Sequence, residues 1–120
     1  MSQDIEKQIN QLNQKLRSVF EEQDQNKSAI QVQEQTEADF HELKIQNNRL
    51  LSRMLETWHG DKELSHFFMS MRQEAQYIEQ KLTFELENQK VKLLKARRDL
   101  RDLENDLSYR QQQLVWEDNT

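Results

Sequence analysis

The chain has 120 residues, of which 34% are hydrophobic and 32% are charged, and its mean hydropathy is -1.11. A typical globular domain is roughly 45–50% apolar, so this composition excludes a round, well-filled core and favours long helices that each bury one narrow stripe. The formal net charge of -5 is unfavourable for a protein that neutralises nucleic-acid phosphates.

The chain has no cysteine, and no apolar stretch follows its initial "MSQD". We therefore expect no disulfide framework, no cleaved signal peptide and no insertion into a membrane. The expected location is the cytoplasm. Export would need a route that uses no cleavable N-terminal signal.

Apolar residues of the first half recur in alternating steps of four and three, the spacing of a heptad seam. The first members are Ile5, Ile9, Leu12, Leu16 and Val19. The same phase then reaches two polar residues, Gln23 and Asn26. The stripe returns with Ile30, Phe40, Leu43, Leu50, Met54 and Trp58. This pattern predicts a helix over about residues 3–57, and the poor helix formers at 24–28 allow a kink or break there.

The midpoint of the chain carries its only glycine, Gly60, within Trp58-His59-Gly60-Asp61, and there is no proline. Glycine suits the left-handed position just past a helix C-terminus, and an aspartate can cap the helix that follows. We therefore predict a turn over residues 58–61, with Trp58 covering the open end of the hairpin.

The second half carries a more strongly apolar seam. Its members are Leu64, Phe68, Met71, Ala75, Ile78, Leu82, Leu86, Leu93, Ala96, Leu100, Leu103, Leu107 and Leu114. They predict a helix over about residues 62–115, with a one-residue phase slip, or stutter, between Leu82 and Leu93. If the chain folds back at the turn, residue i lies opposite roughly residue 119 − i, so that Leu93 faces Asn26. The predicted fold is all-α, a single domain formed by a long antiparallel two-helix hairpin that resembles a coiled coil.

A second apolar stripe follows the second helix. Tyr77, Phe84 and Val91 recur at steps of seven, Leu94 lies close by, and Phe67 and Leu51 add apolar surface near the turn. Because the helix is already paired along its first stripe, a second stripe indicates another helix, from a second copy or from a different protein. Scattered surface aromatics are the alternative interpretation.

No pattern of an enzyme is present, and we expect no catalysis, cofactor or metal ion. His41, His59 and His66 are the only histidines, and the serines lack a glycine elbow. The basic run from Lys90 to Arg101 lies on the leucine seam and is followed at once by "DLENDL". We interpret that run as the charged flank of a packed helix, in preference to a nucleic-acid stripe.

Trp58-His59-Gly60 matches the Trp-x-Gly signature in the turn of the WxG superfamily, small helical hairpins of type VII secretion. The whole chain, particularly "ETWHGDKELSHFFMSM" and "KLTFELENQK", resembles the LXG-associated α-helical proteins of the second type, found in Gram-positive bacteria and described as a domain of unknown function. The resemblance implies a non-enzymatic adaptor or chaperone. Such a protein binds the helical N-terminal domain of an LXG toxin, together with a second small helical protein, and targets the toxin to the secretion system.

The chain departs from that family pattern at the export signals. These signals have the pattern Tyr-x-x-x-Asp/Glu or Phe-x-x-x-Asp. In this chain the residue four positions after Tyr109 is Gln113, and the residue four positions after Phe84 is Asn88, so neither position has the acid. No export signal is evident, although the resemblance leaves open export together with the toxin. The alternative function is a self-associating coiled-coil scaffold, in which two hairpins form a homodimeric four-helix bundle.

Overall fold

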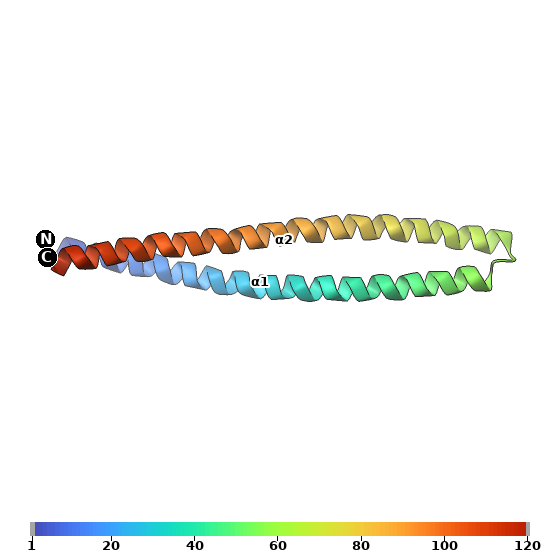
Figure 1. Ribbon diagram of the computed structural model, residues 1–120, viewed down its shortest axis with the longest axis horizontal. Helices are drawn as coiled ribbons and strands as arrows, with labels where there is room; N and C mark the ends of the chain where they lie inside the picture. Colours follow the sequence, from blue (N-terminus) through green and yellow to red (C-terminus); the bar gives the residue numbers. More distant parts are fainter. Residues whose placement is uncertain (1, 120) are drawn as a thin grey trace. The chain divides into compact units, whose positions relative to one another are not determined.

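The computed structural model describes residues 2–119, which form two helices, α1 (Ser2–Thr57) and α2 (Lys62–Asn119), and no strand. This confirms the prediction of an all-α, antiparallel two-helix hairpin (Figure 1). Neither helix contains glycine or proline, so no residue forces an interruption of the helical hydrogen bonds. α1 runs without a break through residues 24–28, and α2 continues to Asn119, past its expected end near residue 115.

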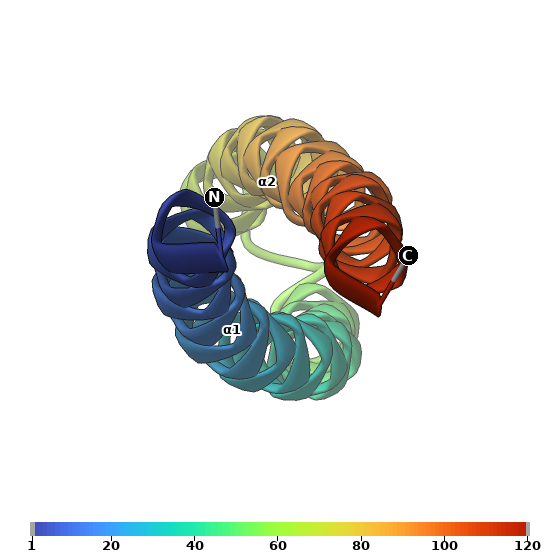
Figure 2. The ribbon, with the colours of Figure 1, turned by 90° about the vertical axis from the view of Figure 1, so that its left-hand side faces the viewer.

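The chain divides into two compact units. The terminal unit joins the start of α1, up to Gln31, to the end of α2, from Val91. The turn unit comprises Val32–Lys90. Within each unit the segments of α1 and α2 lie side by side and run in opposite directions (Figure 1, Figure 2). The single-domain organisation stays a prediction.

The terminal unit has an apolar core. Leu12, Leu16, Val19 and Leu107 are only 4–7% exposed, and Leu100 and Leu114 pack against them. All six belong to the seams that the heptad spacing predicts. Burying such a side chain typically stabilises the folded state by about 1.5–3 kcal/mol, so these residues hold the two helical segments of this unit together.

Polar residues in the seam of the terminal unit have hydrogen-bond partners on the opposite helix. Asn26 is 9% exposed, and its Nδ2 donates a hydrogen bond to the backbone carbonyl oxygen of Leu93 over 3.1 Å. The expected register, in which Leu93 faces Asn26, is thereby confirmed. Gln23 makes a second bond across the seam, from its Nε2 to Oε2 of Glu104 over 3.1 Å.

The turn unit keeps the same register with another buried amide. Gln33 is 6% exposed, and its Nε2 donates to the carbonyl oxygen of Leu86 over 2.8 Å and to Oε1 of Glu37 over 3.2 Å. Glu37 also forms an ion pair with Lys90, with 3.4 Å between Oε2 and Nζ. Polar contacts therefore take the place in this unit that leucines hold in the terminal unit.

Several leucines and isoleucines predicted for the seam of the turn unit lie outside it. Leu43, Leu50 and Ile78 are 53%, 51% and 55% exposed, and Leu82 is 40% exposed. Leu51, predicted to be surface, is instead buried. The seam assignment for this unit is wrong at these positions.

The reason is that the seam keeps its heptad phase by using polar residues. In α1 the buried or half-buried positions of this unit include Gln33, Glu37, Phe40, Lys44 and Leu51, which continue the phase of Asn26 and Ile30. Lys44 lies along the seam with its Nζ 5.2 Å from the centroid of the Phe40 ring. Leu43 and Leu50 each stand one residue before a seam position, so they point to a neighbouring face.

The same displacement occurs in α2 and removes the predicted stutter. Every seventh residue from Glu79 through Leu86 and Leu93 to Leu114 is buried or half-buried, so the phase does not slip between residues 82 and 93. Glu79 takes the seam position, and Ile78 next to it is exposed.

The turn is capped as predicted, but its glycine is not left-handed. The backbone N–H of Leu64 donates to Oδ1 of Asp61 over 3.1 Å, so Asp61 caps α2. The N–H of Asp61 itself donates to the carbonyl oxygen of Trp58 over 3.0 Å. Gly60 has no positive φ, so the expected left-handed conformation is absent. Trp58 is 45% exposed and does not act as a buried plug.

Candidate interaction surface

The histidines do not gather into a metal site. Within residues 2–119 no group of three or more His, Cys, Asp or Glu side chains is arranged to hold a metal ion. His59 is engaged at the turn, with its Nδ1 2.7 Å from the carbonyl oxygen of Glu56. His41 and His66 are exposed on α1 and α2.

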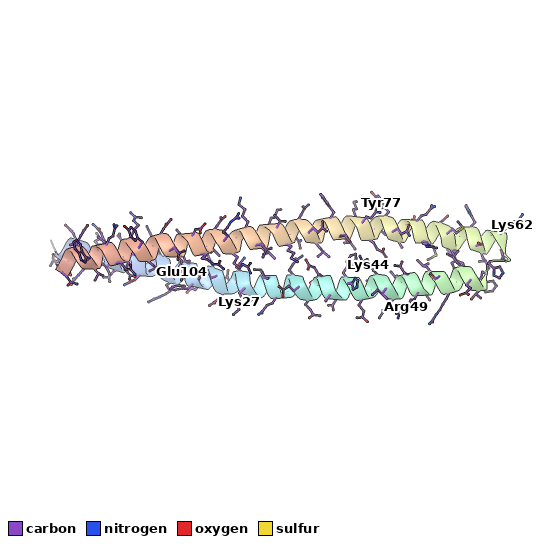
Figure 3. The ribbon with its side chains drawn as sticks, viewed as in Figure 1. Lys27, Lys44, Arg49, Lys62, Tyr77 and Glu104 are labelled. Carbon is purple, nitrogen blue, oxygen red and sulfur yellow. The ribbon has the colours of Figure 1, made fainter. Side chains whose placement is uncertain are left out.

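Two members of the predicted second stripe, Tyr77 and Phe84, are exposed on α2 in the turn unit. Tyr77 and Phe84 are 63% and 65% exposed, and Figure 3 shows Tyr77 projecting from the side of α2 that faces away from α1. Nζ of Lys81 lies 5.8 Å from the centroid of the Tyr77 ring. Phe84 borders an open depression whose lining also includes Lys44 and Glu87. Two exposed rings seven residues apart on one helix face are a suitable contact for another helix.

The remaining predicted binding residues are distributed between the units. Phe67 belongs to the turn unit, is 57% exposed, and packs edge to face against Phe68 with 5.6 Å between ring centroids. Val91 and Leu94 belong to the terminal unit, where Val91 is 66% exposed and Leu94 is half-buried. Tyr77 and Phe84 are thus the members of the predicted set whose exposure and spacing within one unit define a surface.

A further apolar surface of the turn unit was missed by the sequence interpretation. Each of its members stands directly before a buried or half-buried seam residue and is at least 40% exposed. A two-fold axis perpendicular to the plane of two antiparallel helices exchanges the helices and leaves each side of the pair in place. Residues that immediately precede seam positions therefore project to the same side of the pair on both helices. This surface, the open face, consists of Val32, Leu43, Leu50, Phe67, Ile78 and Leu82. Extending the strict seven-residue phase from Asn26 to Gln33 would have revealed it.

The seam beneath the open face holds an unsatisfied carboxylate. Oε1 of Glu79 is buried and has no hydrogen-bond partner among the described residues. Thr83, one turn later, donates its hydroxyl to the backbone carbonyl oxygen of Glu79 over 2.7 Å, not to the carboxylate. Buried polar atoms are normally paired, so the seam of this unit is less completely satisfied than that of the terminal unit, where Asn26 has its partner.

Comparison with known proteins places the chain in a family. A family model described as a protein of unknown function (DUF3958) matches residues 7–114, which include most of both helices and the whole turn. The chain belongs to the DUF3958 family. The comparison with curated proteins gave no match, and neither did the comparison with solved structures.

Two properties of this DUF3958 chain bear on where it can bind. None of the helical segments described is long and apolar enough to cross a membrane. The basic run from Lys90 to Arg101 begins with a residue that is already paired, since Lys90 contacts Glu37 of α1. The interpretation of its start as the charged flank of a packed helix agrees with that contact.

Proposed function

We propose that this DUF3958 chain is a non-enzymatic helical adaptor or chaperone for a secreted toxin. It binds the helical N-terminal domain of an LXG toxin, together with a second small helical protein, and directs the toxin to a type VII secretion system. The proposal extends the resemblance carried by Trp58-His59-Gly60 and the flanking sequence. The observation that supports it is the pair of exposed rings on α2, Tyr77 and Phe84.

The chemistry of this pair suits an amphipathic helix as the ligand. Helices that dock on a helical surface use anchors at i and i+7, and aromatic side chains supply much of the binding energy at such contacts. The hairpin already buries the opposite side of α2 against α1, so this side is free for a helix of the toxin domain. Lys81, beside Tyr77, offers a charge to an acidic residue of that helix.

The export signal comes from another subunit in this proposal. Gln113 occupies the position where the family signal has an acid. Its Nε2 donates a hydrogen bond to the hydroxyl of Tyr109 over 3.1 Å, and both residues are exposed on α2. The adaptor therefore serves to hold the toxin domain in a form that the secretion system accepts.

Co-purification tests the proposal. The tagged chain is co-expressed with an LXG domain and a second small helical protein from the same bacterium, and the complex is isolated and its affinity measured. Tyr77→Ala with Phe84→Ala should weaken binding by roughly tenfold or more, because each removes an aromatic anchor. Tyr109→Ala, which removes an equally exposed ring of the terminal unit, is the matched control.

The circular dichroism of each variant should show unchanged helix content, since all three rings are exposed. If the double variant binds as tightly as the unchanged chain, Tyr77 and Phe84 are not the contact. If no complex with the toxin domain forms at all, the adaptor function is wrong.

A further inference from the structure

We propose that the open face of the turn unit is the contact for a second copy of this chain, with the two turn units packed in antiparallel, two-fold symmetric fashion. This contact is separate from the ring pair on α2, Tyr77 and Phe84, neither of which belongs to the open face. It does not depend on the toxin proposal.

The open face is unusually apolar for a surface of a charged chain. Its six side chains are 40–65% exposed, whereas the polar residues Gln33 and Glu79 lie in the seam behind them. Contiguous exposed apolar patches on soluble proteins generally mark interaction sites. Interfaces that hold stable pairs use about 800 Å² on each partner, which a face running along both helices of the turn unit can supply.

One two-fold axis serves both helices. Leu43 and Leu50 lie at equal distances along α1 from the level between Gln46 and Asn47. A two-fold axis at that level therefore packs Leu43 on Leu50 of the second copy, and Leu50 on Leu43 of the second copy. On α2, Phe67 and Ile78 are equally distant from the level between residues 72 and 73. These two levels lie opposite each other in the hairpin register.

That register is fixed independently of the proposal. The hydrogen bond from Gln33 to the carbonyl oxygen of Leu86 sets which levels of α1 and α2 face each other in the turn unit. The pair Leu43 and Leu50 on α1 and the pair Phe67 and Ile78 on α2 therefore agree on a single axis, which is the condition for a self-complementary interface.

The charges beside the open face agree on the same axis. Asp39, Glu42, Arg49 and Arg53 are exposed on the outer flank of α1, next to Leu43 and Leu50. The axis brings Asp39 to within one residue of Arg53 of the second copy, and Glu42 to within two residues of Arg49 of the second copy. The two copies thus form four pairs of opposite charge. A parallel two-fold arrangement would instead place α1 on α2 of the second copy, so these four pairs would not form.

Pairs of this kind contribute mainly to specificity. Exposed ion pairs add little binding energy individually, but they suppress wrong registers and set the orientation of the partners. Asp39 is held on the helix surface by a hydrogen bond from Nε2 of Gln35 over 2.9 Å. The apolar residues supply the attraction, and the four charges select the antiparallel arrangement.

Sedimentation of the purified chain over a wide range of concentrations is the first test, and it should show a monomer–dimer equilibrium. Leu43→Glu with Leu50→Glu should shift the equilibrium to the monomer, weakening association by roughly tenfold or more. Helix content is measured in parallel, and it should persist because both residues are exposed in the single hairpin. A chain that stays monomeric at every concentration would overturn the proposal.

Charge reversal provides the sharper test. One variant carries Asp39→Lys and Glu42→Lys, and the other carries Arg49→Glu and Arg53→Glu. Each alone should dimerise more weakly than the unchanged chain, because like charges then face each other. An equal mixture should form a heterodimer, since all four pairs regain opposite charge.

Two results would contradict this arrangement. A mixture that associates no better than its components shows that these flanks do not meet. Loss of the dimer in the Tyr77→Ala, Phe84→Ala control would assign the contact to the ring pair instead. That control also separates the two proposals, because it should weaken binding of the toxin domain and leave the dimer unchanged.

Discussion

Gly60 shows how a residue type and its conformation can disagree. As the single glycine of the chain, it suits a left-handed turn position, yet its φ is not positive. Apart from Gly60 itself and its two chain neighbours, no residue has a heavy atom within 4 Å of the place that a Cβ would occupy there. The turn is held by other contacts, among them the N–H of Asp61 on the carbonyl oxygen of Trp58.

Gly60→Ala should therefore leave stability unchanged or raise the free energy of unfolding by about 0.4–1 kcal/mol, because alanine lowers the conformational entropy of the unfolded chain and meets no steric obstacle. Urea unfolding followed by circular dichroism measures the change. Asp61→Ala is the contrasting variant. It removes the acceptor for the N–H of Leu64 and should lower the free energy by about 1 kcal/mol. A clear loss with Gly60→Ala would show that the turn needs a left-handed glycine.

At the scale of the helices, the sequence predicts more than the apolar pattern alone would suggest. The absence of proline, the isolated glycine and the heptad spacing predict two helices, their ends near the turn, and the register that pairs Asn26 with Leu93. In the terminal unit most apolar residues follow the heptad phase, so Leu12 and Leu107 are buried as expected, whereas Leu103, predicted for the seam, is 44% exposed and stands directly before half-buried Glu104.

In the turn unit several apolar residues lie outside the positions that the heptad phase places in the seam. A seam assignment that follows leucines selects Leu43, whereas the structure follows the phase and buries Gln33. Gln33 can be buried because a carbonyl oxygen of the opposite helix accepts a hydrogen bond from its Nε2, and a sequence pattern does not display this partner. The exposure of Tyr77 and Phe84 was predictable, because neither residue belongs to the predicted seam or to the heptad positions that the structure buries.

Two leucines with the same predicted role should therefore respond differently to truncation. Leu16→Ala removes a side chain that is 7% exposed in the core of the terminal unit and should lower the free energy of unfolding by about 2–4 kcal/mol. Leu43→Ala removes one that is 53% exposed and should cost less than about 1 kcal/mol in dilute, monomeric solution.

The free energy is again obtained from urea unfolding, with helix content as the probe. Equal losses in the two variants would mean that Leu43 is as well buried as Leu16 in solution, and that the seam of the turn unit closes around its leucines.

At the scale of the whole molecule, the two units differ in what stabilises them. The terminal unit has four buried apolar side chains in one cluster, whereas in the turn unit the buried set consists of Leu51 and the amide of Gln33. Stability in proteins is distributed in this local manner, and elements that bind partners come from the less stable part. Both proposed contacts, the ring pair and the open face, use residues of the turn unit, where additional burial would stabilise the protein most.

Hydrogen exchange of the full chain tests that distribution. Backbone amides near Leu16 and Leu107 should exchange more slowly than those near Leu43 and Ile78, because opening the terminal unit exposes its apolar core and opening the turn unit exposes much less. Protection near Leu43 and Ile78 should rise with protein concentration as the open faces pair, and protection near Leu16 should change little. Uniform protection in dilute solution would contradict the division, and a concentration-independent pattern would contradict the pairing. Because the first comparison is made between amides in dilute solution and the second between concentrations for the same amides, the stability of the units and the self-association of the turn unit are judged independently.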